Sequence, residues 1–158
     1  MNIKCFIILP LNIKDDDGHY VWYRPDTGEQ FKKYKWPVGA IWRAEWYEDF
    51  KPWTGEDGMS WCVMTPGGEW FIDGQASNCG SLCKVCGIKY RDHYKKHGDS
   101  INDHHWEEST PGHKCWCRHG VAPNFTVNKI GITCDAGAGS IQIGNYHGFL
   151  INGELTQC

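Results

Sequence analysis

Long apolar runs, a strong excess of basic residues and an export signal are all missing from this sequence. No window of roughly 18 uninterrupted apolar residues occurs, which excludes a transmembrane helix. The chain carries 16 basic and 19 acidic side chains and a formal net charge of −3, whereas a protein that coats nucleic acid needs a large positive excess. We therefore expect no membrane partner and no general nucleic-acid partner.

The features of a secreted disulfide protein are also absent. The N-terminal residues hold a short apolar run up to Leu11, and Asp15-Asp16-Asp17 follows without a small-residue cleavage site. The 9 cysteines among 158 residues are an odd number, and they fall below the roughly 8–10% of small disulfide scaffolds. We expect an N-terminal strand that ends at Pro10 and a protein that resides in a reducing cytoplasm. In that compartment clustered cysteines are more often metal ligands than disulfides.

Turn residues between apolar runs indicate where strands pair. Pro66-Gly67-Gly68 separates two such runs within 59–73, and Asn152-Gly153 separates two more within 146–157. Glycine supplies the positive φ that tight turns need, and Asn-Gly is the strongest two-residue hairpin signal. Both segments are therefore predicted to be β-hairpins.

The remaining pattern predicts a single domain of the mainly β class. A strand is expected at His19–Tyr23 between turns, and the ambiguous period of Val38–Phe50 favours a strand over a helix. Residues 79–119 differ in composition and hold most of the cysteines and histidines. We predict a small sheet or sandwich-like domain over 1–158, built from hairpins, with a Cys/His-rich insert at 79–119 that contains a short helix.

The densest chemistry lies inside this insert. Cys83 and Cys86 form a C-x2-C knuckle, and His93 and His97 are spaced to share one face of a helix over about Lys89–Lys96. Together they read C-x2-C-x6-H-x3-H, four ligands of the types that tetrahedral zinc favours. The sequence thus predicts a structural Zn²⁺ site.

Other residues compete for places in this site. Cys79 and Cys115 are included with Cys83, Cys86, His93 and His97 in the predicted ligand set, and further competitors are His104, His105, His113, Cys117 and His119. The alternative without metal is a set of small buried cysteines and solvated histidines.

The second half of the insert resembles HNH-type endonucleases. An Asp-His step follows a C-x2-C pair and precedes a second cysteine pair, which in those enzymes frames a histidine that activates water while a divalent ion holds the phosphate. By this resemblance His104 or His105 would be the base and Asp103 its neighbour or a metal ligand. The second cysteine pair is C-x-C here, and Glu107 and Glu108 would repel phosphate.

The 9 tryptophans are too many to be fully buried in one small core. Trp22, Trp61 and Trp70 lie in predicted strands and are expected in the core. Trp36 and Trp53 stand beside prolines in turns and are expected at the surface. Exposed aromatic rings mark contact surfaces, so a binding or assembly role is favoured over catalysis.

The cysteines outside the insert have separate expected roles. Cys5 and Cys62 fit small core positions, and Cys158 is a terminal thiol with no assigned role. Cys134 with His147 could bind a metal or form a nucleophile with its base. A packed hairpin histidine is favoured at His147, because no third, orienting residue is identified.

A further set of segments carries a resemblance to known proteins. These segments are Pro37–Trp42, Thr65–Gly74, Ala76–Cys79, His113–Trp116, Arg118–Gly120, Thr133–Ile141 and Tyr146–Leu150. They resemble a family of small proteins encoded in tailed-bacteriophage genomes, and the match covers about 37–158. In that family Cys79 and Cys115 stand on either side of a segment of variable length, so the C-x2-C knuckle looks like part of an enlarged insert. The resemblance implies a phage origin and no particular activity.

We therefore expect a non-enzymatic virion component, either a capsid-decorating or a tail-associated structural protein. A structural zinc site would stabilise it, and aromatic surface residues would dock on other phage structural proteins or on further copies of the chain. It would reside in the host cytoplasm before assembly. The alternatives are a zinc-braced HNH-like endonuclease and a host-directed or DNA-associated binding protein.

Overall fold

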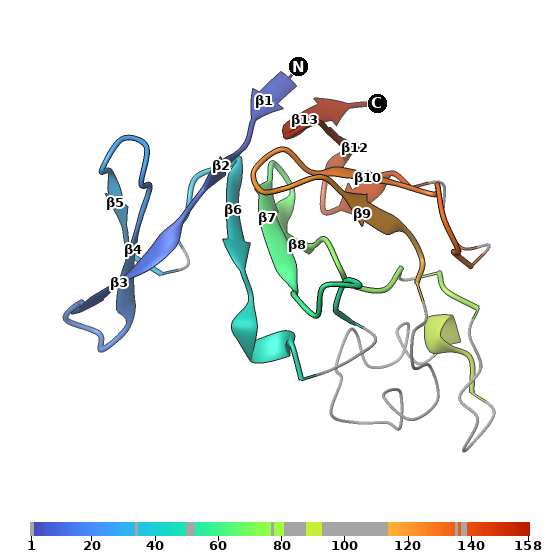
Figure 1. The fold of residues 1–158 in the computed structure, drawn as a ribbon, viewed down its shortest axis with the longest axis horizontal. Helices are drawn as coiled ribbons and strands as arrows, with labels where there is room; N and C mark the ends of the chain where they lie inside the picture. Colours follow the sequence, from blue (N-terminus) through green and yellow to red (C-terminus); the bar gives the residue numbers. More distant parts are fainter. Residues whose placement is uncertain are drawn as a thin grey trace.

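The structure is a computed structural model that describes most of the chain. It describes residues 2–33, 35–49, 53–76, 78–80, 88–92, 114–134, 136 and 139–158. These residues form a mainly β fold of several small sheets (Figure 1), as the sequence predicts. A short helical segment begins at residue 90. No helix among the described residues is both long and apolar enough to cross a bilayer.

One four-stranded sheet joins the two ends of the chain. Its order is β1 (Asn2–Lys4), β13 (Glu154–Gln157), β12 (Tyr146–Ile151) and β11 (Ile141–Ile143), and all neighbours are antiparallel. The pairing of β1 with β13 places the N- and C-terminal segments side by side (Figure 1). The β12–β13 hairpin confirms the Asn-Gly prediction, since Asn152 and Gly153 both have positive φ.

A second four-stranded sheet runs through the middle of the molecule. Its order is β2 (Phe6–Ile7), β6 (Ala40–Arg43), β7 (Trp61–Thr65) and β8 (Gly68–Phe71). Strands β2 and β6 are parallel, whereas β6–β7 and β7–β8 are antiparallel. The β7–β8 pair is the first of the two predicted hairpins.

Two smaller sheets complete the fold. Strands β3 (Leu9–Lys14), β4 (Tyr20–Tyr23) and β5 (Gln30–Phe31) form an antiparallel sheet on one flank (Figure 1). Strands β9 (Cys117–His119) and β10 (Thr126–Asn128) pair with each other. Strand β4 confirms the predicted strand before Arg24.

Two sequence predictions of strand limits need correction. The N-terminal extended segment does not end at Pro10, which lies inside β3 and opposite Trp22. Proline is tolerated there because β3 is at the edge of its sheet and a missing N–H costs no ladder hydrogen bond. The Val38–Phe50 segment contains β6 but then tightens into a 3₁₀ turn, η1 (Glu45–Tyr47).

A tryptophan cluster fills the space between the flank sheet and the central sheet. The ring centroid of Trp36 lies 4.9 Å from that of Trp22 and 4.4 Å from that of Trp42. All three are buried. The prediction that Trp36 lies at the surface is therefore wrong, because neighbouring strands bring two other indoles onto it.

A larger core lies between the central sheet and the sheet of the chain ends. It contains Val63, Ile72, Phe125 and Leu150, and Trp53 belongs to it. The Trp53 ring packs 5.3 Å from that of Phe71 and is only 4% exposed, so its predicted surface position is also wrong. Trp61 on β7 and Trp70 on β8, which are also expected in the core, are half-buried and pack against it.

The two four-stranded sheets meet where their turns touch. A Cβ on Gly67, in the β7–β8 turn, would lie 1.9 Å from the Ile143 carbonyl oxygen, and one on Gly144 would lie 2.7 Å from that of Gly67. Neither approach leaves room for a side chain, so the backbone of β11 and the turn before β8 are held in direct contact.

Gly67→Ala is therefore expected to destabilise the protein. Overpacking against a backbone atom that cannot rotate away should lower the free energy of unfolding by about 1–3 kcal/mol, as measured by urea denaturation. Gly80→Ala is the matched control, because a Cβ there would have no atom of the described residues within 4 Å. Equal stability of the two variants would contradict the close contact.

Candidate metal centre

Three cysteines from distant parts of the chain converge at one point. Cys79 follows β8, Cys115 precedes β9, and Cys134 lies between β10 and β11. Their sulfur atoms all lie within 4.8 Å of one another. Cys79 and Cys115 are completely buried, and Cys134 is half-buried.

The spacing of these sulfurs suits a metal ion better than a disulfide. The sulfurs are 3.7–4.2 Å apart, and all three cysteines are free thiols. Bonded sulfurs are about 2.05 Å apart. With Zn–S bonds of about 2.3 Å, two ligands of a tetrahedron are separated by about 3.8 Å. The cluster therefore supplies three corners of a tetrahedral site.

Each sulfur also accepts a hydrogen bond from a nitrogen donor. Such donors stabilise thiolate charge and orient metal ligands. The pairs are Gln75 Nε2 with Cys79 Sγ (3.5 Å), the Ala76 N–H with Cys115 Sγ (3.3 Å), and the Ala136 N–H with Cys134 Sγ (3.4 Å). This surrounds the cluster with donors, the environment expected of bound thiolates.

Lys129 holds the backbone beside two of the cysteines. Its ammonium donates to the carbonyl oxygen of Cys115, to that of Cys134 at 2.6 Å and to that of Ala136 at 2.8 Å. One cation therefore ties together two segments separated by the β9–β10 hairpin.

Without an ion, the Cys115 thiol stays protonated. Hydrogen bonding with Cys79 and burial raise the pKa of the Cys115 thiol far above its ordinary value. A bound divalent cation reverses that preference, because a coordinating thiol loses its proton. Metal binding at this site should therefore release protons and strengthen with rising pH.

The structure brings together only part of the predicted ligand set. Cys79 and Cys115 belong to the cluster. Cys117 and His119 are among the described residues but do not belong to it. His119 instead contacts Asn128, with Nε2 2.9 Å from its Oδ1. The predicted ligands Cys83, Cys86, His93 and His97 lie outside the described residues, as do the competitors His104, His105 and His113.

Cys134 was not in the predicted ligand set. Sequence reasoning paired it with His147, but that side chain is exposed on β12 and its Nε2 lies 3.1 Å from Ser140 Oγ. The one signal in the sequence is the stretch with Gly137 and Gly139 shortly after Cys134, since glycines near a cysteine permit the tight backbone path of a metal loop.

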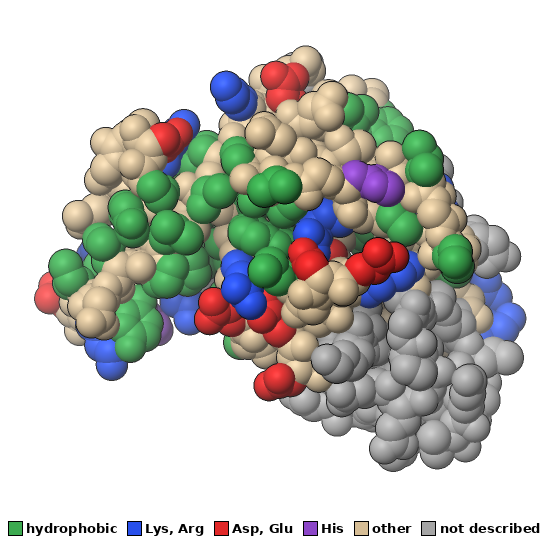
Figure 2. Space-filling model, in the orientation of Figure 1, with side chains coloured by type: hydrophobic (Ala, Val, Ile, Leu, Met, Phe, Trp, Pro, Cys, Tyr) green, Lys and Arg blue, Asp and Glu red, His purple; other side chains and the backbone are tan. Residues whose placement is uncertain are grey.

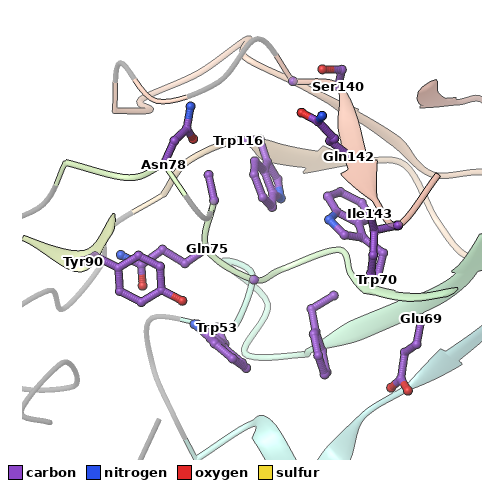
Figure 3. A pocket seen from close by; sticks show the side chains of 15 residues that line it. Trp53, Glu69, Trp70, Gln75, Asn78, Tyr90, Trp116, Ser140, Gln142 and Ile143 are labelled. Carbon is purple, nitrogen blue, oxygen red and sulfur yellow. The ribbon is translucent and has the colours of Figure 1, made fainter. Parts of the chain in front are cut away.

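A cavity of about 400 Å³ (Figure 3) is lined by residues that neighbour the cysteine cluster. Gln75 and Ala76, whose N–H groups reach two of the sulfurs, line this cavity, and so does Trp116, the residue after Cys115. Residues 139 and 140, which follow the Cys134 loop, form another part of its wall. The segments that carry the cysteines thus also shape the cavity.

The proposed nuclease residues Asp103, His104 and His105 lie outside the described residues. The features of the described residues from which a function can be argued are a sulfur cluster, a cavity and exposed apolar side chains.

No family model matches the chain, and comparison with curated proteins and with solved structures finds no match either.

Proposed function

We propose that this chain is a non-enzymatic binding protein of a phage particle, with a β-fold braced by a structural zinc ion. One observation carries the metal part of the proposal: three thiols from three segments meet within 4.8 Å, and each sulfur faces an N–H donor. Sulfur-rich tetrahedral sites select zinc or iron–sulfur groups, and a single ion of zinc needs only one further ligand.

The proposed ion would link three segments that neighbour three different sheets. Cys79, Cys115 and Cys134 would supply three ligands. The sequence pattern favours the fourth among Cys83, Cys86, His93 and His97. A small β-domain gains folding free energy from such a link, because the ion binds the folded chain and not the unfolded one.

The chemistry of the cluster favours a structural role over catalysis. Catalytic zinc sites keep one position open to solvent and rely mostly on histidine and carboxylate ligands. Here Cys79 and Cys115 are buried, and all three residues of the cluster are cysteines. Both properties support a brace.

Exposed apolar side chains support the docking part of the proposal. Leu9, Ile13 and Tyr20 lie on β3 and β4 and are 42%, 59% and 48% exposed. Figure 2 shows apolar side chains gathered over this flank of the molecule. Trp46, on η1, is 54% exposed. Because β3 is also a sheet edge, a neighbouring subunit of the particle could cover both its side chains and its free backbone groups.

Purified particles of the phage that encodes the chain provide the test. Mass spectrometry should find the protein in many copies per particle, and its absence from particles would refute the assignment.

An Ile13→Asp variant tests the docking flank within the same particles. It should be depleted from them, because a charge on the apolar flank opposes burial against a subunit. Asn12→Asp, which adds the same charge on the same exposed strand, should be incorporated normally. Equal incorporation of the two variants would exclude this flank as the docking surface.

A further inference from the structure

The cavity beside the cysteine cluster is lined by an unusual number of aromatic rings. Trp53, Trp70, Tyr90 and Trp116 all contribute to its wall, together with Phe71. In Figure 3 the Trp70 and Trp116 rings lie on one side, Tyr90 lies opposite them, and Trp53 lies below. Its volume of about 400 Å³ falls within the range of small-molecule sites, roughly 300–1,000 Å³.

The polar groups of this cavity are nearly all uncharged. Among the described lining residues they come from Gln75, Asn78, Ser140 and Gln142, with Glu69 as the one carboxylate. No lysine, arginine or histidine is among these residues. A ligand with a phosphate or carboxylate group would find no cation among them, so an anionic ligand is disfavoured.

Gln75 connects the wall of the cavity to the cysteine cluster. Its Nε2 donates to Cys79 Sγ, and its Oε1 is buried away from solvent. The position of this side chain in the cavity wall therefore depends on the cluster.

The ring geometry disfavours a flat aromatic ligand. Trp70 and Trp116 are in contact, with centroids 5.2 Å apart and planes inclined by 37°. No planar base fits between them, and the pair forms an angled apolar wall. A puckered ring with C–H groups on its faces and hydroxyls around its rim matches that wall and the surrounding amides, hydroxyl and carboxylate.

We propose that this cavity binds an uncharged sugar unit, a hexose or an N-acetylhexosamine, of a saccharide. The inference rests on the proposed function, because the segments that carry the three cysteines also form walls of the cavity. The metal would hold Gln75 through Cys79 and Trp116 through Cys115 at fixed positions. Saccharide binding should therefore be strongest in the zinc-loaded protein.

The test uses the zinc-loaded full chain on an array of neutral oligosaccharides built from glucose, galactose, mannose and their N-acetylamino derivatives. The strongest binder is then measured by calorimetry. Trp70→Ala should abolish binding, and Gln142→Ala, an exposed position on β11, should weaken it about tenfold through one lost hydrogen bond. Trp46→Ala, an exposed tryptophan that does not line the cavity, should bind normally.

Absence of binding to every neutral sugar would overturn the inference, as would unchanged binding by both cavity variants. Preferential binding of adenine, an uncharged planar ligand without a sugar, would show that the ligand class is wrong. Zinc content is measured in the same samples. Zinc without sugar binding refutes only the saccharide site, whereas cavity-dependent sugar binding without zinc refutes only the metal brace.

Discussion

The Cys115→Ser variant is expected to lose the zinc ion. Its free energy of unfolding should fall by about 4 kcal/mol or more, the stabilisation that a bound ligand gives when present at a thousand times its Kd. The serine oxygen is a poor replacement for a thiolate in a sulfur-rich site. Cys115 is also central to the cluster, since its sulfur accepts the Ala76 N–H and its carbonyl accepts a hydrogen bond from Lys129. Thermal unfolding monitored by circular dichroism measures the loss.

Two other cysteine variants separate metal loss from ordinary packing effects. Cys62→Ser replaces a completely buried cysteine outside the cluster, and Cys117→Ser replaces a half-buried one near it. Both should keep their zinc and should still be destabilised by a chelator, whereas Cys115→Ser should be insensitive to it. A chelator that leaves the melting temperature of the unmodified protein unchanged would contradict the metal brace.

Arg118→Met is expected to destabilise the fold by about 3–5 kcal/mol, the usual cost of breaking a buried ion pair by removing one partner. Arg118 Nε lies 2.9 Å from Asp73 Oδ1, and its Nη2 lies 2.9 Å from Asp57 Oδ1. The side chains of Arg118 and Asp73 are only 8% and 5% exposed. Asp73 also accepts the Trp61 N–H at 2.8 Å, so the pair attaches β9 to β7.

An exposed ion pair of similar geometry is the control. Arg24 Nε lies 2.6 Å from Asp26 Oδ1, but the Asp26 side chain is 57% exposed. Solvent screens such a pair, so Arg24→Met should cost much less than Arg118→Met. Chemical denaturation of both variants at pH 7 measures the difference, and equal losses would show that the buried pair has no special role.

The loss in Arg118→Met should also depend on pH. Burial raises the pKa of the Asp73 carboxyl, and Arg118 opposes that rise; its removal should raise the pKa further. A carboxyl with a raised folded-state pKa destabilises the fold as it ionises, so the deficit should be largest at neutral pH and shrink as falling pH protonates Asp73. The hydrogen bond from Arg118 lowers the pKa of Asp57, so this pair stabilises the fold only while Asp57 is ionised. Protonation of Asp57 at low pH therefore also reduces the stability difference between Arg118→Met and the unmodified protein. A deficit independent of pH would contradict an ionised Asp73.

The parts of the fold that the sequence predicts are those specified by local chemistry. The hairpin turns at Asn152-Gly153 and Pro66-Gly67-Gly68 occur as predicted, because a positive φ within two or three residues is enough to reverse a strand. Pairings between distant segments have no such signal. Neither the pairing of Asn2 with Thr156 nor the parallel pairing of Phe6 with Ala40 could be anticipated from neighbouring residues.

The tryptophans show the same limit. Trp36 stands beside a proline in a turn, which suggests exposure, yet it is buried because strands β4 and β6 bring two indoles against it. Burial of this kind depends on which sheets pack together. Residue type and local spacing do not contain that information.

The kind of ligands at the candidate site could be predicted from the sequence, but only some of the residues that form it could. The number and clustering of the cysteines favour metal ligands over disulfides, and Cys79 and Cys115 lie in the cluster. Cys134 is separated from them by the β9–β10 hairpin, so no ligand spacing connects it to the insert. Only the packing of the loop after β10 against the segment after β8 brings its sulfur to the other two.

The zinc content of protein purified without added metal tests the central claim most directly. Elemental analysis of the unmodified chain and of Cys134→Ser distinguishes the cluster from a site built by the C-x2-C and histidine pattern alone. We expect about one zinc ion per chain in the unmodified protein, as four-coordinate structural sites hold, and a large loss of zinc in Cys134→Ser. A metal-free unmodified protein, or full zinc content in Cys134→Ser, would contradict a metal centre at Cys79, Cys115 and Cys134.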